Sequence, residues 1–536
     1  METLVTSEGA ELASDYYLTN FQTLTEEVRR RSAHLLSPEE TRWLRRFDGL
    51  ERTQQCLLVR LLSRKGPLFR LDKLSYAEIP DLAGCAQALV ETELAAWHPI
   101  SNWTELGGLC TKAELLAMAP DANPKLRKPE LLDSLKSQPL PSHRLQVLNL
   151  KGSSILDTLR LLYFGNLHQD LAQFVVTDLG IQRFESYPIT ADGLAIDSRE
   201  ALETWLSLGE LAKACHLCLE RRNPDGLLEL APRLPDPLPW PEIERKRQRL
   251  ALLFAREWER REQFDQALML YDQTALPPSR ERQARIALKL EQTEPALRQV
   301  TRMLQAPQDE QEATVGARLG KQLARQGHWH WSPLPAHKVR QQALTLSDNG
   351  ERVELQVAQH YQAQGWQVFY CENSLLNGLL GLVIWPALFE PVPGAFLNPY
   401  QMGPRDLYRA QFAEHRRKRL DKELRHWRPK QLLARYRDKQ GILNPLVQWD
   451  WFPIELAELA LATLPRSLLD ACFQRQLFDL RGNRSGHPDL FMAKESQARW
   501  LEVKGPGDRL QDNQTRWMRF LEDQGADVAV CQVKFE

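Results

Sequence analysis

The sequence predicts a multidomain protein with a mainly α N-terminal region and a C-terminal α/β domain of element order αβββαβ. Three observations lead to this prediction. The chain has 536 residues, too many for a single hydrophobic core. Residues 16–345 are dominated by apolar positions at three- and four-residue spacing, which is typical of helices. Residues 346–536 alternate between helical and strand patterns.

Composition excludes several classes of protein. With 43% hydrophobic and 26% charged residues the chain can bury a sizeable core, and its net charge of -1 shows no overall preference for a polyanion. The eight cysteines are scattered through apolar segments, which indicates reduced thiols. The acidic start lacks a secretory signal, and no apolar run reaches the length of about 18 residues that a membrane span needs. We therefore expect a cytoplasmic protein with no membrane partner.

Residues 1–100 are expected to form an N-terminal helical DNA-binding region. Apolar spacing predicts helices over 16–63, and Ser37 followed by Pro38 is a helix start, with serine as the cap. The segment RLLSRKGPLFRLDKLSY places basic side chains between apolar ones. Such a face could contact phosphates, but a solvated helix face fits equally well. The basic residues are Arg60, Arg64, Lys65, Arg70 and Lys73.

Residues 101–145 hold a short pair of predicted helices, one opening at Thr111 and one at Lys128. The pattern resembles a SAP module, a helical pair that binds the DNA backbone, and the resemblance implies DNA contacts from Lys112 and Lys128. An ordinary helical hairpin would show the same short pattern.

Residues 146–345 are predicted to be a tetratricopeptide-like helical domain. Long amphipathic segments suit helical hairpins, and Arg261 to Tyr271 resembles the second helix of a tetratricopeptide repeat. No strict period is visible, so only degenerate repeats are expected. The proline-containing segment WSPLPAHKVRQQ marks the boundary with the C-terminal domain.

The C-terminal domain, 346–536, begins with a predicted helix over 351–364. Gly365 ends this helix in a position suited to a left-handed cap, and a strand over 366–371 follows, with Glu372 at its end. A second helix covers 373–385. A basic helical insertion of about 386–480 then separates this first half of the domain from a hairpin, a helix and a last strand.

The hairpin places two carboxylates opposite each other. Asp489 and Glu502 are equally distant from the midpoint between Glu495 and Ser496, where a polar run allows a two-residue turn. Directly opposed residues have Cβ atoms about 5 Å apart, close enough for two carboxylates to share one divalent cation. Strand alternation puts Glu502 and Lys504 on one face, and Leu490, Met492, Leu501 and Val503 on the other, toward the core.

These residue types suit metal-dependent phosphodiester cleavage. Carboxylate oxygens prefer Mg²⁺ or Mn²⁺, which can neutralise a phosphate and activate water. Lys504 could orient or deprotonate that water and stabilise developing charge. The alternative is a surface hairpin with charged ends. The surrounding helices, the strand and Glu372 favour the metal site over this alternative.

The helix after the hairpin is predicted to start at Asp508 as its cap, with Gln511 as the capping partner. Its apolar stripe includes Trp517 and Leu521, and Gln514 lies on the same stripe. A glutamine there is either a site residue or a core residue with satisfied hydrogen bonds. The segment ADVAVCQV after Gly525 is the last strand.

The segments GHPDLF, LEVKGPGDRLQDNQ and GADVAVCQV resemble the VRR-NUC domain, a branch of the restriction-endonuclease-like PD-(D/E)xK nucleases. The wider chain resembles the bacterial Fanconi-associated nucleases through RLLSRKGPLFRLDKLSY, LLYFGNLHQDLAQFVVTDLG, YCENSLLNGLLGLVIW and VQWDWF. The resemblance implies a C-terminal α/β restriction-endonuclease-like fold. It also implies a DNA-repair enzyme that cuts 5′ flaps and acts as a 5′-to-3′ exonuclease.

The resemblance also implies roles for individual residues. Metal binding falls to Glu372, Asp489, Glu502 and the backbone carbonyl of Val503, and the catalytic lysine is Lys504. Basic positions near the incised strand correspond to Arg481 and Arg509, and we expect Gln514 to contact DNA as well. Eukaryotic relatives add a ubiquitin-binding zinc finger, for which no Cys or His cluster is seen here.

The insertion is dense in arginine and lysine between Arg405 and Lys439, with aromatic residues interleaved. Arg416 and Arg417 are expected to contact DNA phosphates in a salt-sensitive way. A solvated basic helix with internal acidic partners is the alternative.

Together these patterns predict a structure-specific DNA endonuclease and exonuclease that uses Mg²⁺ or Mn²⁺ and acts on branched or flapped DNA. The long N-terminal region favours a monomer. A Holliday-junction-type resolvase is a second hypothesis and would need a dimer. A non-catalytic DNA-binding scaffold is a third, but it predicts the loss of a metal ligand, and every one is present.

Overall fold

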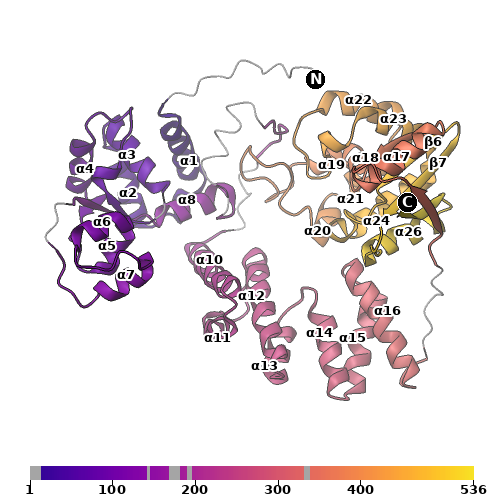
Figure 1. Cartoon of the computed structure of the whole chain (residues 1–536), viewed down its shortest axis with the longest axis horizontal. Helices are drawn as coiled ribbons and strands as arrows, with labels where there is room; N and C mark the ends of the chain where they lie inside the picture. Colours follow the sequence, from indigo (N-terminus) through magenta and orange to yellow (C-terminus); the bar gives the residue numbers. More distant parts are fainter. Residues whose placement is uncertain are drawn as a thin grey trace. The chain divides into compact units, whose positions relative to one another are not determined.

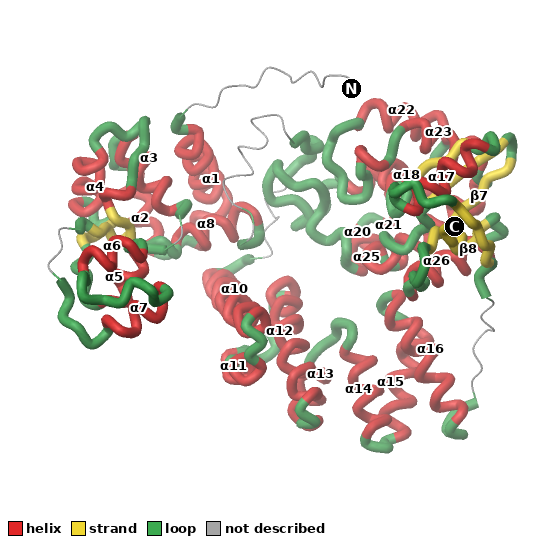
Figure 2. The backbone as a smooth tube through the Cα atoms, in the orientation of Figure 1, coloured by secondary structure: helices red, strands yellow, loops and turns green. Residues whose placement is uncertain are grey.

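A computed structural model describes residues 14–64, 66–141, 145–167, 169, 182–189, 196–330 and 338–536. Lys65, most of the segment 168–181 and the predicted linker residues 331–337 lie outside this description. The chain divides into two compact units, shown in Figures 1 and 2. The first comprises 1–181 and 196–206, and the second comprises 182–195 and 207–536.

The first unit is helical, as predicted, but it also contains a small sheet that the sequence analysis missed. Strand β3 (Val147–Leu150) lies between β1 (Leu68–Arg70) and β2 (Ala95–Trp97), antiparallel to both. Strands this short carry almost no alternation signal. Since β3 belongs to this unit, the expected boundary at residue 145 cuts through it. The main helices are α1 (Tyr16–Ser32), α2 (Pro38–Asp48), α3 (Arg52–Leu62), α4 (Leu82–Glu91) and α8 (Ile155–Phe164).

The SAP-like segment folds as helices α5 (Trp103–Leu109), α6 (Lys112–Met118) and α7 (Lys128–Leu135) around their own apolar cluster. Thr111 caps α6 in a reciprocal capping box with Glu114. Leu115, Leu131 and Leu135 are fully buried at the centre of the cluster.

A series of helices follows, the first of which starts in the first unit and continues into the second. From the second of these helices onward, each packs against the next in sequence, as helical hairpins do. They are α10 (Arg199–Glu220), α11 (Pro224–Glu229), α12 (Pro241–Arg260), α13 (Phe264–Asp272), α14 (Ser279–Lys289), α15 (Thr293–Gln305) and α16 (Glu310–Arg325). In the described ranges, no helix has both the length and the apolar character to cross a membrane.

The C-terminal domain contains a five-stranded mixed sheet of order β4-β8-β7-β6-β5. The predicted αβββαβ order is present as α17 (Val353–Ala363), β5 (Gln367–Tyr370), β6 (Leu490–Lys494), β7 (Gln497–Lys504), α26 (Asp512–Asp523) and β8 (Val528–Phe535). Strand β4 (Gln341–Leu346), parallel to β8, was not predicted. It lies at the sheet edge and half of its residues are exposed, so its pattern resembles a linker.

The predicted hairpin register is confirmed. Leu490 pairs with Leu501 and Lys494 with Gln497, which leaves Glu495 and Ser496 as the two-residue turn. The same register brings Asp489, just before β6, opposite Glu502.

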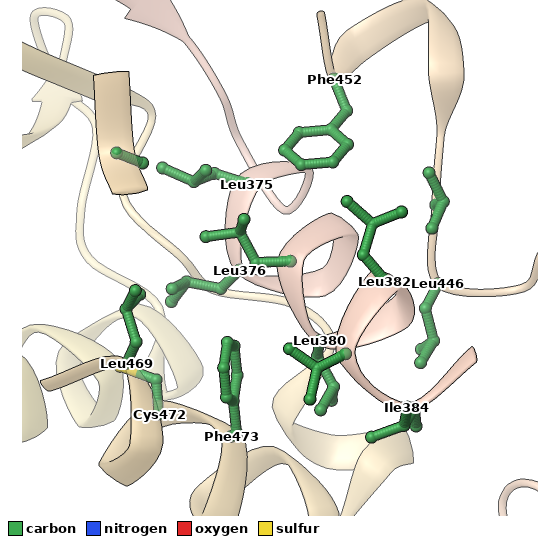
Figure 3. Packing of buried hydrophobic residues seen from close by; sticks show 14 of the residues in the cluster. Leu375, Leu376, Leu380, Leu382, Ile384, Leu446, Phe452, Leu469, Cys472 and Phe473 are labelled. Carbon is green, nitrogen blue, oxygen red and sulfur yellow. The ribbon is translucent and has the colours of Figure 1, made fainter. Parts of the chain in front are cut away.

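Both faces of the sheet are covered, which corrects the expectation that only one face is core. Leu490, Leu501 and Val503 pack on the α17 side as predicted. The opposite face carries Phe491 and Trp500, which belong to a larger apolar cluster. This cluster is centred on α18 (Leu375–Val383) and includes α24 (Arg466–Phe478), as Figure 3 shows. Glu502 therefore points into the interior, where none of its surface is exposed.

The predicted insertion is helical. After α18 and the short α19 (Trp385–Leu388), it contains α20 (Ala410–His415), α21 (Arg417–His426), α22 (Pro429–Lys439), η5 (Trp449–Trp451), α23 (Ile454–Thr463), α24 and α25 (Leu480–Asn483). The start of α16 packs on its end, because Glu310 pairs with Arg475 and its carboxylate accepts a hydrogen bond from Asn483.

The expected cap of the last helix is wrong. Gln511, not Asp508, is the N-cap of α26, and Gln514 is its capping-box partner. Residues 505–510 instead form the loop that leaves β7. The capping-box spacing repeats three residues later in this sequence, so the pattern alone could not choose between the two starts.

Gly365 follows α17 with φ +85°, as its predicted left-handed cap role requires. We expect Gly365→Ala to lower the free energy of unfolding by about 1–2 kcal/mol, because a Cβ is strained in this conformation. Thermal unfolding would measure the loss. The matched control is Gln364→Ala, the preceding exposed residue with ordinary φ -91°, which should change stability by less than about 0.5 kcal/mol. Equal stability of the two variants would contradict the prediction.

Candidate active site

The hairpin β6–β7 brings Asp489 and Glu502 together at one end of the sheet. Asp489 is 6% exposed, and its Oδ2 accepts a hydrogen bond of 2.8 Å from the backbone N–H of Val503. The carbonyl of Asp489 accepts a second backbone bond, of 2.8 Å, from Cys371. Asp489 is thus held by both neighbouring strands.

Burial raises the pKa of both carboxyl groups. Burial raises the pKa of Glu502 to about 8, and repulsion from Asp489 adds to the effect. Burial likewise raises the pKa of Asp489 to about 6, against the hydrogen bond from Val503, and the charge of Glu372 contributes. Glu502 Oε2 is buried without any hydrogen-bond partner. Such a pair is costly unless a positive charge is bound between its members.

Lys504 supplies one positive charge. Its Nζ lies 2.8 Å from Oε1 of Glu502, and its side chain is 12% exposed. Burial lowers the pKa of Lys504, but the contact with Glu502 outweighs burial, and the net shift is upward. The lysine therefore lies in the site as a cation, on the predicted face of β7.

Glu372 lies at the end of β5, as expected, but its carboxylate is exposed and bonded locally. Oε2 accepts a hydrogen bond of 2.6 Å from Tyr370, and Oε1 accepts one of 3.2 Å from Asn373. Its charge still acts on both Asp489 and Glu502. Across the described residues, no three His, Cys, Asp or Glu side chains are gathered closely enough to hold a metal ion.

The two halves of the site are joined by side-chain hydrogen bonds although more than a hundred residues separate them. Asn373 accepts a bond from the backbone N–H of His487, and Asn377 donates one of 2.8 Å to the carbonyl of Arg484. Gln476 in turn donates to Asn377. The loop that carries Glu372 is therefore fixed to the loop that leads into Asp489.

The arrangement fits a divalent cation. Oε2 of Glu502 is buried and has no hydrogen-bond partner. Asp489 lies opposite Glu502, and no ion pair among the described residues neutralises its charge. Carboxylate oxygens are the donors that hard divalent ions prefer. Val503, the predicted carbonyl ligand, already contacts Asp489 through its N–H. Its carbonyl role and that of Glu372 stay predictions.

The predicted DNA-contact residues have different surroundings. Arg481, Arg509 and Arg417 are exposed. Arg416 is not: it is 1% exposed and pairs with Asp406 at 2.7 Å, so its predicted surface contact with DNA is wrong. Gln514 is half-buried and accepts a hydrogen bond from the N–H of Gln511, which gives it a structural role in the cap.

In the SAP-like segment, Lys112 donates a hydrogen bond of 2.6 Å to the carbonyl of Pro124, which ties α6 to the following loop. Lys128 is the first residue of α7 and is half-buried. Their predicted DNA contacts stay predictions.

Much of the positive charge in the insertion is neutralised internally, as the alternative interpretation expected. Arg405 and Arg409 pair with Glu242 of α12, and Arg419 and Arg435 pair with Glu423. An exposed basic strip runs along α21 and the start of α22, and its side chains form no ion pair with the acidic residues that the structure describes. It consists of Arg417, Lys418, Lys422, Arg425, Arg428 and Lys430.

A second basic group was missed by the sequence analysis. It consists of Arg245 and Arg249, one turn apart on α12, and Arg481 of α25. Burial lowers the pKa of Arg245, and repulsion from Arg249 and then from Arg481 lowers it further. Burial and repulsion from Arg481 lower the pKa of Arg249. Nε of Arg245 is buried without a partner. Arg481 and Arg484 both lie over the ring of Tyr408, at 5.8 and 5.2 Å. The basic segment ERKRQR on α12 was the available signal.

Three family models match the chain. The model described as "FAN1, HTH domain" matches residues 15–96, and the "Fanconi anemia-associated nuclease SAP domain" matches 104–146. The "VRR-NUC domain" matches 425–535, a range that includes the hairpin but not Glu372.

Relatives match along nearly the whole chain. The Fanconi-associated nuclease 1 homolog of Pseudomonas aeruginosa is 36% identical over 97% of this chain and 96% of its own length. The Arabidopsis thaliana homolog is 24% identical over 97% of this chain and 67% of its own. A crystal structure of paFAN1 bound to 5′ flap DNA with a two-nucleotide flap and a gap is similar with a TM-score of 0.88 and 35% identity, covering 98% of this chain and 99% of that one.

Proposed function

This chain belongs to the Fanconi-associated nuclease family, and we propose that it is a structure-specific DNA-repair nuclease that cuts phosphodiester bonds at 5′ flaps and acts as a 5′-to-3′ exonuclease. Crystal structures of a similar protein, paFAN1, contain 5′ flap DNA with flaps of one and two nucleotides. The observation that carries the proposal is the buried pair Asp489 and Glu502 with Lys504 beside it.

The family uses a divalent metal, and we propose that Mg²⁺ or Mn²⁺ serves here, held by Asp489, Glu502, the carbonyl of Val503 and Glu372. When bound, such an ion supplies positive charge at the scissile phosphate and makes a water molecule more acidic. Glu372 could join this set by exchanging its bond to Tyr370 for the ion.

The side chains of the site have separate tasks in this scheme. Asp489 is oriented by the N–H of Val503, so it needs no reorganisation to bind. Lys504 places its ammonium group where negative charge develops as the phosphodiester bond breaks. The apolar clusters on both sheet faces bury Glu502 and most of Asp489, so little water reaches these two carboxylates.

Two basic groups in the second unit support DNA binding: the exposed strip on α21 and α22, and the arginines of α12 and α25. Both would contact phosphates without reading sequence. We propose Arg481 and Arg509 as contacts beside the cut, and Lys112 and Lys128 as contacts from the SAP-like segment.

Arg249→Ala should weaken DNA binding at low salt and reduce the slope of log affinity against log salt concentration by about 1, because one phosphate contact is lost. Fluorescence anisotropy over a salt series would measure the slope. The matched control is Arg260→Ala on the same helix, since Arg260 is exposed but pairs with Glu257. A salt slope equal to that of the wild type would remove Arg249 from the interface.

The function is tested by offering labelled 5′ flap, 3′ flap, four-way junction and single-stranded DNA with Mg²⁺ or Mn²⁺. Preferred cutting of the 5′ flap supports the proposal. Symmetric nicking of the junction alone would favour the resolvase hypothesis, and binding without cutting of any substrate would favour the scaffold hypothesis. We propose that the protein acts as a monomer in the cytoplasm, on the DNA of the nucleoid.

A further inference from the structure

Trp451 is an exposed aromatic residue next to the candidate active site. Trp451 is 53% exposed and ends a short helical turn, η5, in which Asp450 is also exposed and Trp449 is half-buried. Trp449, two residues earlier, donates its indole N–H to the carbonyl of Ile442 at 2.7 Å and packs against Tyr436. Trp451 is the more exposed of the two tryptophans of this turn.

The backbone beside Trp451 is firmly anchored. Phe452 is fully buried against α18, where a Cβ added to Gly378 would come within 2.5 Å of its ring. Figure 3 shows Phe452 near Leu375 of that helix. Tyr436 donates a hydrogen bond of 2.8 Å to the carbonyl of Phe452. The exposed ring is therefore carried by a rigid support, which lowers the entropy cost of binding to it.

Trp451 is connected to Glu372 through a single residue. The ring of Tyr370 meets that of Trp451 edge to face, with centroids 5.9 Å apart and planes at 71°. The hydroxyl of Tyr370 donates to Oε2 of Glu372 at 2.6 Å. The guanidinium of Arg352 lies over the same tyrosine ring at 5.3 Å. An exposed tryptophan, a half-buried tyrosine and an exposed arginine thus border the carboxylate.

Exposed aromatic rings beside cations are the features that bind single-stranded nucleic acid, because each base has a π-face that stacks and each phosphate attracts positive charge. A fully paired base inside a duplex has no free face to offer. The ring of Trp451 contacts Tyr370, which is bonded to Glu372, a carboxylate proposed to hold the metal. A base stacked on Trp451 would therefore be close to the bond that is cut. A protein partner at this position would obstruct the DNA.

We propose that the ring of Trp451, supported edge to face by Tyr370, forms a stacking platform for one unpaired nucleobase next to the scissile phosphate, with Arg352 contacting an adjacent phosphate. The proposal rests on the proposed nuclease function and deepens it. The platform requires an unpaired nucleotide beside the cut but does not distinguish among the four bases. It holds that nucleotide in position while the carboxylates and Lys504 act on its neighbour.

An abasic scan tests the platform. Single nucleotides of a 5′ flap substrate around the cut are replaced in turn by an abasic unit, and affinity is measured in EDTA so that no cleavage occurs. At one position the wild type should lose about 5- to 150-fold in affinity, the range of one base stacked on an aromatic residue. Trp451→Ala should lose a similar factor on intact DNA and lose nothing further at that position.

Two variants serve as controls. Trp451→Phe keeps an aromatic face and should restore most of the base dependence. Phe478→Ala removes another exposed aromatic side chain, 49% exposed and located on α24, and should leave the scan unchanged. Tyr370→Phe keeps the ring and loses only the hydroxyl that bonds to Glu372, so the base dependence in the scan should be kept.

The inference fails if Trp451→Ala shows the same position-dependent loss as the wild type, or if no abasic position matters to the wild type. It also fails if Trp451→Ala binds intact DNA as tightly as the wild type. These binding results do not depend on cleavage. The proposed function fails separately, if the wild type with Mg²⁺ or Mn²⁺ cuts none of the substrates.

Discussion

Asp489→Ala is expected to reduce DNA cleavage by at least about 1000-fold, because loss of a metal-binding carboxylate removes several kcal/mol of charge stabilisation in the transition state. Asp489 is also the residue that N–H of Val503 orients from the opposite strand. Its removal would leave Glu502 without the carboxylate that we propose shares the cation. Initial rates on a labelled 5′ flap, at saturating Mg²⁺ or Mn²⁺, would measure the effect.

The matched control for this variant is Glu495→Asn, at the far end of the same hairpin. Glu495 is exposed and has φ +56°, a conformation that asparagine tolerates, so the turn should persist while one negative charge is lost. Its cleavage rate should stay within about twofold of the wild type. An Asp489→Ala protein that folds and cuts at the wild-type rate would show that the site has been placed in the wrong part of the chain.

In the metal-free protein, Glu502→Gln is expected to raise the free energy of unfolding at alkaline pH, by about 1–3 kcal/mol. Burial and the neighbouring Asp489 raise the pKa of Glu502 from 4.5 to about 8. A pKa that is higher in the folded state means that the folded protein binds the additional proton. The stability that this proton contributes is complete below about pH 4.5 and is lost as pH rises toward about 8.

Glutamine has no proton to lose, so the variant should show a flatter dependence of stability on pH. Scanning calorimetry in EDTA between about pH 5 and pH 8 would compare the two proteins. Addition of Mg²⁺ or Mn²⁺ should then stabilise the wild type and leave the variant almost unchanged, since the variant lacks the second carboxylate. Parallel pH profiles, or equal stabilisation by metal, would contradict a buried acidic pair that binds a cation.

These two predictions share one physical origin. The interior around Glu502 includes Trp500 and Phe491, whose rings are 4.8 Å apart and fully buried. Apolar surroundings make an unpaired carboxylate unfavourable and a bound cation correspondingly favourable. The features that destabilise the metal-free fold are therefore the same ones that would favour metal binding.

The sequence alone determined the local elements of the site. The hairpin register follows from a two-residue turn and strict alternation, and both are properties of neighbouring residues. The αβββαβ order and the left-handed Gly365 are equally local, and the structure confirms them. Family resemblance added Glu372, which lies too far from Asp489 in the chain for any pattern to connect them.

Only the tertiary structure decided which charged side chains are exposed and which are buried or paired. Arg416 and Arg417 are neighbours in one basic run, yet the first is buried with Asp406 and the second is exposed. Arg245 is close enough to Arg481 for their charges to repel, although the two residues are far apart in the sequence. The exposure of a charge depends on which distant residue covers or pairs with it, and that choice is made by the fold as a whole, because ion pairs and burial join residues that are far apart in sequence.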